Sequence, residues 1–94
     1  MVKKEPIVLP ADTSDAEDFD VTAEAMDRGQ RARLIRKVRS GLGLSQADFA
    51  ERFRVPVGTL RDWEQARATA PDFAVAYVRV IQAAPELVMK TLAA

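Results

Sequence analysis

The residues best suited to molecular recognition lie at positions 44–64, where two short helical patterns flank a turn at residues 54–56. At 100° per residue, Leu60 and Trp63 share one side of the second pattern. The side chains left over on its other side are polar or small, and they are Gly58, Arg61, Asp62 and Gln65. Two short helices with polar groups free on the second are typical of a motif that enters the DNA major groove.

Arg61 is the strongest candidate for reading a base, because an arginine can bond guanine O6 and N7 together. The alternative is an ion pair of Arg61 with Glu64 or Asp62 on the protein surface. Gln46 sits at the N-terminus of the first helix, where free N–H groups favour a phosphate, although Ser45 and Gln46 could simply cap that helix. The other candidates for DNA contact are Val57 (a thymine methyl), Gly58 (close approach), Thr59 (a phosphate), Asp62 (a cytosine amino group, or orientation of Arg61) and the basic residues Arg36, Lys37, Arg39 and Arg67.

The composition argues against catalysis. The 94 residues, enough for one small domain, include no Cys and no His. The sequence therefore offers no disulfide, no thiolate and no imidazole, and we expect neither a metal site nor a cofactor. No constellation of nucleophile, base and stabiliser is visible, so an enzyme is the weakest hypothesis. There is also no apolar run of membrane-spanning length and no secretory signal, so we expect a cytoplasmic protein.

The net charge of zero hides an asymmetry between two segments. Residues 1–27 contain eight acidic and two basic residues, and residues 28–94 contain six acidic and twelve basic ones. A basic body suits a phosphate backbone, and an acidic arm suits a basic partner. The alternative is a solvated acidic tail beside an arginine-rich surface.

Helical periodicity runs through the basic segment and predicts an all-α, compact five-helix domain. Thr22 is a candidate cap for a short helix over 23–28 that Gly29 weakens or ends. The five helices of the domain are expected after it, over about 31–42, from Ser45 to the turn, over about 56–65, from Pro71 to about 83, and from Pro85. The helix after Pro71 is apolar over most of its circumference, which suggests burial on more than one side. Residues 1–27 are predicted to form an arm that is at least partly disordered.

The segment Leu44-Ser45-Gln46, with Phe49-Ala50, Val55, Thr59-Leu60 and Trp63-Glu64, resembles the Cro/C1-type (XRE) helix-turn-helix family. Residues 56–65 resemble HigA-type antitoxins in particular, and the likeness spans roughly residues 31–83. The resemblance implies a lambda-repressor-like domain that binds a palindromic operator as a homodimer and represses its own operon. It also implies a toxin partner of the RelE/HigB kind, a ribosome-dependent mRNA nuclease. Arg54 and Ala66 depart from the pattern, since the family often has Gly at both positions.

The segments outside the motif are candidates for protein contacts. An acidic arm over residues 1–27 could cover a basic toxin, with the apolar residues Ile7, Val8, Leu9, Phe19, Val21 and Met26 as hooks. Helical residues 22–40 could share that contact. Leu87, Val88 and Leu92 are the candidate dimer contacts within the 28–94 domain, unless the last helix only closes the core. The alternatives are a stand-alone repressor without a toxin and a protein-interaction module that has lost DNA binding.

Overall fold

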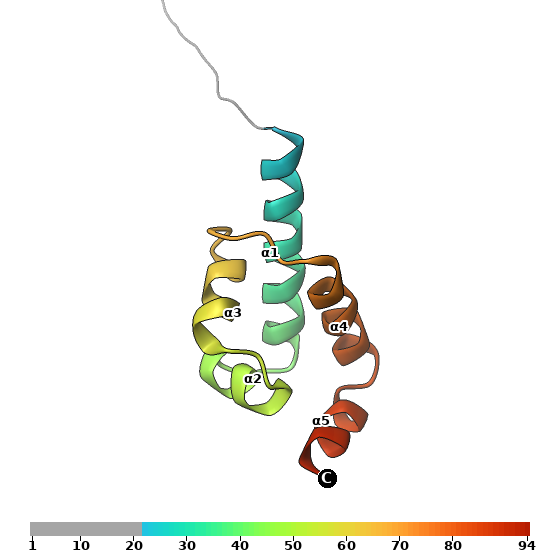
Figure 1. The fold of residues 1–94 in the computed structure, drawn as a ribbon. Coiled ribbons are helices and arrows are strands. Elements are labelled where there is room, and N and C mark those ends of the chain that lie inside the picture. The colour runs from blue at the N-terminus through green and yellow to red at the C-terminus, as the bar shows by residue number, and fades with distance from the viewer. Residues whose placement is uncertain (1–21) are drawn as a thin grey trace, which may run out of the picture.

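The computed structural model describes residues 22–94, which form five α-helices and no β-strand (Figure 1). In chain order they are α1 (Ala23–Gly41), α2 (Gln46–Phe53), α3 (Val57–Glu64), α4 (Asp72–Ala83) and α5 (Pro85–Ala93). The expected all-α, five-helix class is therefore confirmed. None of these five helices is long and apolar enough to cross a membrane.

The first helix differs from its prediction, because α1 continues through Gly29 instead of ending there. The expected cap is present: the Thr22 hydroxyl accepts a hydrogen bond from the Ala25 N–H at 3.1 Å. A glycine inside a helix costs only about 1 kcal/mol relative to alanine. Arg31 offsets that cost by donating to the Ala70 carbonyl and pairing with Asp27 and Asp72, which ties this part of α1 to the start of α4.

The core lies where α1 meets α3 and α4, and where α2 meets α3 and α5. The predicted core residues Phe49 and Phe53 are fully buried, with ring centroids 4.8 Å apart. Leu60 is buried as expected, while Trp63 packs against the core and remains partly exposed. The largest buried side chains are Ile35, Phe49, Phe53, Leu60 and Ile81.

Helices α1, α2 and α3 end in the same way. After each helix comes a residue with positive φ, and the N–H of the next residue donates to the carbonyl five positions before it. The residues in the left-handed conformation are Gly43 (φ 70°), Arg54 (φ 60°) and Ala66 (φ 57°). Behind them, Leu44, Val55 and Arg67 donate their N–H groups to the carbonyls of Arg39, Ala50 and Asp62. This is the Schellman arrangement, in which glycine is usual. Arg54 and Ala66, which depart from the family's glycines, therefore still adopt the left-handed conformation and end α2 and α3.

Replacing Ala66 with glycine is expected to stabilise the fold by about 0.5–1 kcal/mol. The left-handed conformation costs a non-glycine residue roughly 1–2 kcal/mol, and the greater freedom of glycine in the unfolded chain offsets part of that gain. Gly43→Ala is the matched control with the opposite sign, because a Cβ at Gly43 would meet no atom within 4 Å and only its backbone conformation would be strained. Urea denaturation followed by circular dichroism measures both changes; a destabilised Ala66→Gly protein would contradict this account.

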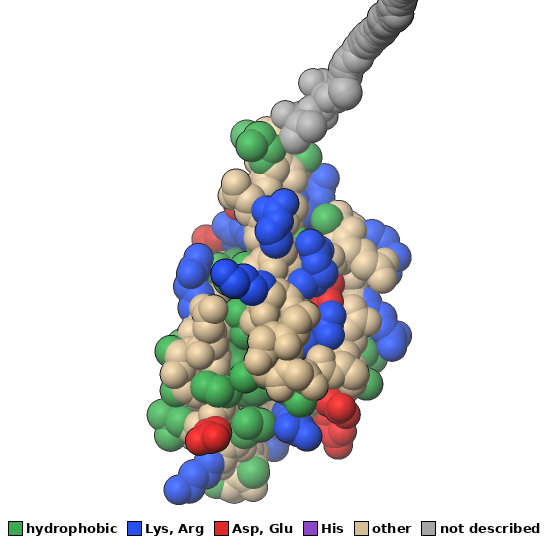
Figure 2. Space-filling view, turned by 180° about the vertical axis from the view of Figure 1, so that it is seen from behind, with side chains coloured by type: hydrophobic (Ala, Val, Ile, Leu, Met, Phe, Trp, Pro, Cys, Tyr) green, Lys and Arg blue, Asp and Glu red, His purple; other side chains and the backbone are tan. Residues whose placement is uncertain are grey.

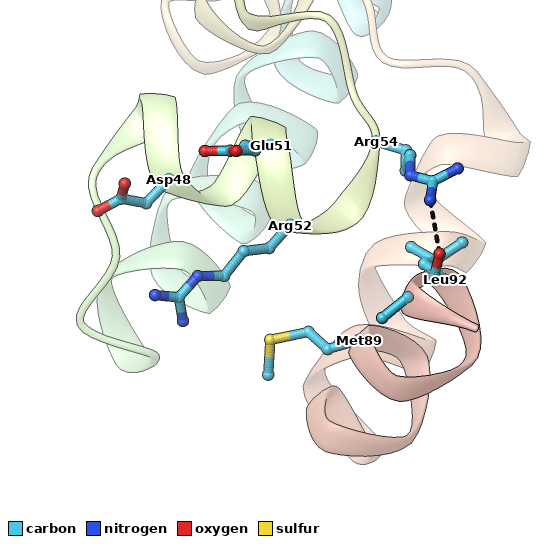
Figure 3. Close-up of a pocket in the computed structure, with 7 residues that line it drawn as sticks. Asp48, Glu51, Arg52, Arg54, Met89 and Leu92 are labelled. Carbon is cyan, nitrogen blue, oxygen red and sulfur yellow. Dashed lines mark hydrogen bonds between the residues drawn. The ribbon is translucent and has the colours of Figure 1, made fainter.

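Arg54 occupies its unfavourable conformation while linking α2 to α5. Its Nη2 donates to the Leu92 carbonyl at 2.5 Å, as Figure 3 shows. In the same view the Arg52 and Met89 side chains extend into an open pocket of about 430 Å³ between the two helices. The Tyr77 hydroxyl adds a tie from α4 by donating to the Phe53 carbonyl at 2.7 Å. These two hydrogen bonds connect the turn between α2 and α3 to helices α5 and α4.

Candidate nucleic-acid interface

The two helices of the motif are held by local caps and by the turn between them. Ser45 caps α2 as predicted, since its hydroxyl accepts a hydrogen bond from the Asp48 N–H at 3.1 Å. Pro56 immediately precedes α3, where its missing N–H leaves no donor without a partner. The sequence therefore builds both ends of the turn from residues that stop one helix and start the next.

Helix α3 presents a narrow exposed face. Gly58, Arg61 and Gln65 are exposed, on the side opposite the buried Leu60. Three other predicted contacts on this segment, Val57, Thr59 and Asp62, are only partly exposed. Val57 packs against the core, and Thr59 lines an apolar groove between α3 and α4. The structure thus brings Gly58, Arg61 and Gln65 together as the part of α3 with most room for a ligand.

The carboxylate of Glu64 joins α1, α2 and α3 inside the protein. It is the only charged side chain buried within residues 22–94, with a side-chain exposure of 2%. Arg39 on α1 donates to it twice, from Nε at 2.7 Å and from Nη2 at 2.9 Å. Gln46 on α2 donates to it from Nε2 at 3.0 Å. A buried carboxylate needs such partners, because an unpaired one would lose its hydration without compensation.

This network decides how Gln46 is presented. Its amide nitrogen is anchored on Glu64, so the carboxamide stands at the N-terminus of α2 in a fixed orientation. One amide hydrogen and the carbonyl oxygen of the side chain are not used in that bond. A carboxamide with a free donor and a free acceptor can bond a phosphate or the edge of an adenine. The geometry leaves Gln46 able to contact DNA as well as to brace the motif.

Arg39, predicted as a phosphate contact, is instead held inside the protein. Besides its two bonds to Glu64, its Nη1 donates to the Leu44 carbonyl at 2.9 Å. Its side chain is 19% exposed. The hydrogen-bonded carboxylate of Glu64 raises the pKa of Arg39 above its ordinary value. The guanidinium stays charged, and its place in the interface is that of a support beneath Gln46.

The ion pair weighed as the alternative for Arg61 does not form within residues 22–94. Glu64 is taken by Arg39, and Asp62 pairs with Arg67, whose Nη2 lies 3.0 Å from the Asp62 carboxylate. The side chains of Asp62 and Arg67 are 48% and 60% exposed, so solvent reaches both members of the pair. Exposed pairs of this kind contribute little and exchange readily for other partners. Arg61 and Arg67 are thus both accessible to an anion.

Basic side chains continue from α3 onto α1. The exposed bases of α1 are Arg33, Arg36 and Lys37. Arg36 reaches the C-terminal end of α3, where its Nη1 donates to the Glu64 carbonyl. Figure 2 shows Lys and Arg side chains gathered over the upper half of the rear face, with few acidic ones among them. Positive charge is therefore available around the end of α3 as well as on its exposed face.

The residues predicted to contact a toxin or a second copy of the chain differ in how exposed they are. Met26 is 54% exposed on the first turns of α1, whereas Ile7, Val8, Leu9, Phe19 and Val21 lie outside the described residues. On α5, Leu87 is 65% exposed. Val88 packs against the core, and Leu92 lines the pocket beside α2. Of the three candidate dimer residues, only Leu87 therefore presents most of its side chain.

Glu64 and Gln65 were not among the predicted DNA-contact residues, and the structure gives both a place at the candidate interface. Glu64 was expected on the surface as a possible partner of Arg61, yet it is the centre of the buried network. Its position directly after the half-buried Trp63, at the end of a short helix, gave no signal of burial. Gln65 shares the exposed face with Arg61, and its angular position had already indicated this.

The arrangement of α2 and α3 defines a helix-turn-helix domain, and comparison with known proteins assigns its family. Residues 35–87, more than half of the chain, match the family model described as helix-turn-helix, and the chain belongs to the Cro/C1-type (XRE) helix-turn-helix family. A solved structure described as an HTH XRE-family like protein from Agrobacterium tumefaciens is 41% identical, with a TM-score of 0.61. The match covers 63% of this chain and 95% of that one. No curated protein matches the sequence.

Proposed function

We propose that this protein is a sequence-specific repressor that binds operator DNA as a dimer, with Arg61 as its main base-reading residue. Membership of a DNA-binding regulatory family supports DNA binding and transcription regulation. The observation that carries the residue assignment is the exposed face of α3, where Arg61 has no ionic partner within residues 22–94 while both nearby carboxylates are engaged elsewhere. Gln65 is exposed on the same side of the helix, and Gly58 leaves space for close approach.

The contacts divide into two kinds. Arg61, Gln46 and Gln65 present hydrogen-bonding groups suited to base edges or nearby phosphates. Arg36 and Arg67, at the C-terminal end of α3, suit phosphates, which position the protein without reading sequence. Val57, Thr59 and Asp62 contribute at the margins, because each is partly covered by the protein. Arg39 acts indirectly by holding Glu64.

The test is a titration of fluorescently labelled DNA from upstream of the protein's own gene, with a scrambled duplex as control. We expect preferential binding to the upstream DNA, and affinity that falls linearly with salt on a logarithmic scale. Equal affinity for both duplexes would contradict sequence-specific repression. No binding to either duplex at low salt would exclude DNA binding altogether.

We further propose that the protein is the antitoxin of a basic, RelE/HigB-like mRNA nuclease, which it neutralises through direct contact. The support is the asymmetry of charge, eight acidic and two basic residues in positions 1–27, together with apolar residues among those acids. A nuclease that binds RNA carries a basic surface, which an acidic segment complements. A stand-alone repressor without a toxin is the competing function, and a small basic protein encoded beside this one would favour the antitoxin.

Removing residues 1–21 is expected to abolish neutralisation while leaving DNA binding in place. The truncated chain retains every described helix and loses the apolar residues 7–9. Co-expression with the neighbouring gene product, scored by growth and by co-purification, measures the effect, and a thermal melt checks that the domain still folds. Full protection by residues 22–94 would place the contact on the helical domain, and failure of the intact chain to co-purify would favour the stand-alone repressor.

A further inference from the structure

Helix α4 carries an apolar stripe that no other described element covers. Its buried face, formed by Ala74, Val78 and Ile81, points into the core. Away from that face, Val80 is 53% exposed, and Phe73, which also lines the apolar groove between α3 and α4, is 74% exposed. The full exposed stripe consists of Phe73, Ala76, Val80 and Ala83. The expectation that α4 is buried on more than one side is thus not met within residues 22–94.

The spacing of this stripe is that of a helix–helix contact. Its members follow one another at intervals of three, four and three residues, the pattern that keeps one side of a helix facing a partner helix. Scattered exposed apolar residues are normal, but a continuous stripe marks an interaction surface. Leu87 at the start of α5 is also 65% exposed, but the non-helical Ala84 (φ −147°, ψ 65°) separates the two helices, so the spacing of the α4 stripe does not extend to it.

We infer that the α4 stripe is the contact with a second copy of this chain, packed antiparallel about a two-fold axis close to Ala76. Phe73 of one copy then lies near Val80 of the other, because the two residues are almost equidistant from Ala76 in sequence. Ala76 itself, with the smallest side chain of the central positions, lets the two helices approach closely at the axis. A two-fold contact repeats each of these pairs.

Charge favours this orientation and this partner. Asp72 and Arg79 lie beside the stripe on the same flank of α4, seven residues apart and both exposed. In an antiparallel pair the two flanks come together, so Arg79 of each copy faces Asp72 of the other. In a parallel pair the flanks lie on opposite sides and the charges stay unmatched. Asp72 already contacts Arg31, yet its side chain is 93% exposed and keeps room for a second cation.

The size of the surface sets the expected strength of the dimer. Helix α4 has 12 residues, which is about 18 Å of helix. A contact limited to one such helix is smaller than the roughly 800 Å² per partner of a standard interface. The free protein is therefore expected to dimerise at micromolar concentrations, and paired half-sites on an operator would strengthen the association. This last point rests on the proposed DNA binding, whereas the dimer itself does not.

The absence of cysteine allows a direct test on the full-length chain. In the Ala76→Cys variant the two introduced thiols lie near the axis, within the Cα separation of about 4.4–6.8 Å that a disulfide requires. We expect a covalent dimer on mild oxidation. Ala68→Cys, exposed in the loop between α3 and α4, is the matched control and is expected to form no covalent dimer. Equal cross-linking of both variants, or none at Ala76→Cys, would overturn the inference.

A charge reversal provides an independent second measurement. Arg79→Asp is expected to weaken the dimer in sedimentation equilibrium, whereas Arg79→Lys, which keeps the positive charge, is expected to retain it; both leave the Arg31–Asp72 pair in place. An Arg79→Asp protein that dimerises as well as the Arg79→Lys protein would contradict the antiparallel pairing. Both experiments are done without DNA, so a chain that does not cross-link at Ala76→Cys but still binds its upstream DNA specifically refutes this inference and leaves the proposed DNA recognition standing. A dimer that binds no DNA refutes only the proposed function.

Discussion

Replacing Glu64 with alanine is expected to destabilise the folded protein by about 3 kcal/mol. The substitution leaves the Arg39 guanidinium without the carboxylate that accepts two of its hydrogen bonds. Breaking a buried ion pair on one side typically costs 3–5 kcal/mol. We expect the lower end of this energy range because the Arg39 side chain is 19% exposed and can recover some hydration. For a domain whose total stability is of order 5–15 kcal/mol, this is a large loss. Urea denaturation monitored by circular dichroism measures it.

Two controls separate burial from charge in this prediction. Asp62→Ala removes a carboxylate from the exposed Asp62–Arg67 pair and is expected to cost less than about 1 kcal/mol. The Arg39→Met/Glu64→Leu double variant replaces the buried pair with apolar side chains and is expected to regain most of the lost stability. It should nevertheless bind operator poorly, because Gln46 loses the acceptor that fixes its side chain. A Glu64→Ala protein as stable as the wild type would refute the role of the network.

Replacing Arg61 with alanine is expected to weaken operator binding by about 1–3 kcal/mol and to relax specificity at one base-pair position. A bidentate arginine–guanine contact discriminates against other bases by this amount, roughly a 5- to 150-fold change in affinity. Since Arg61 is exposed and not engaged by Glu64 or Asp62, stability should change little. Anisotropy titrations on the operator and on its single-base variants measure both effects.

Arg67→Ala is the matched comparison for this experiment. Arg67 is an exposed arginine at the other end of the interface and is assigned to a phosphate. Its loss should weaken binding to all duplexes alike and reduce the salt slope by about 1 for each subunit. The Arg61→Lys variant keeps the charge but cannot form the two parallel bonds, so it should resemble Arg61→Ala in specificity. If Arg61→Ala and Arg67→Ala proteins have the same profile across operator variants, Arg61 does not read a base.

The helices and the exposed face of α3 were predictable because both depend on local sequence. Ser45, Pro56 and Pro71 mark helix starts through their own hydrogen-bonding or ring constraints, and the structure begins helices next to each of them. The angular separation of Leu60 from Arg61 follows from 3.6 residues per turn, whatever surrounds the helix. The one wrong boundary, at Gly29, arose where tertiary contacts of Arg31 outweighed a weak local preference.

The sequence by itself determined the fold class, the helix-turn-helix motif and the face that carries Arg61. Only the tertiary structure decided which carboxylate pairs with which guanidinium. Glu64 and Arg39 are 25 residues apart, and their pairing depends on how α1 packs against α3. Local periodicity also showed that α4 is apolar nearly all round, but it could not say which side the core would take. Burial depends on how the helices pack together. The exposed stripe at Phe73, Ala76 and Val80 could therefore be identified only once the structure showed that Ala74, Val78 and Ile81 face the core.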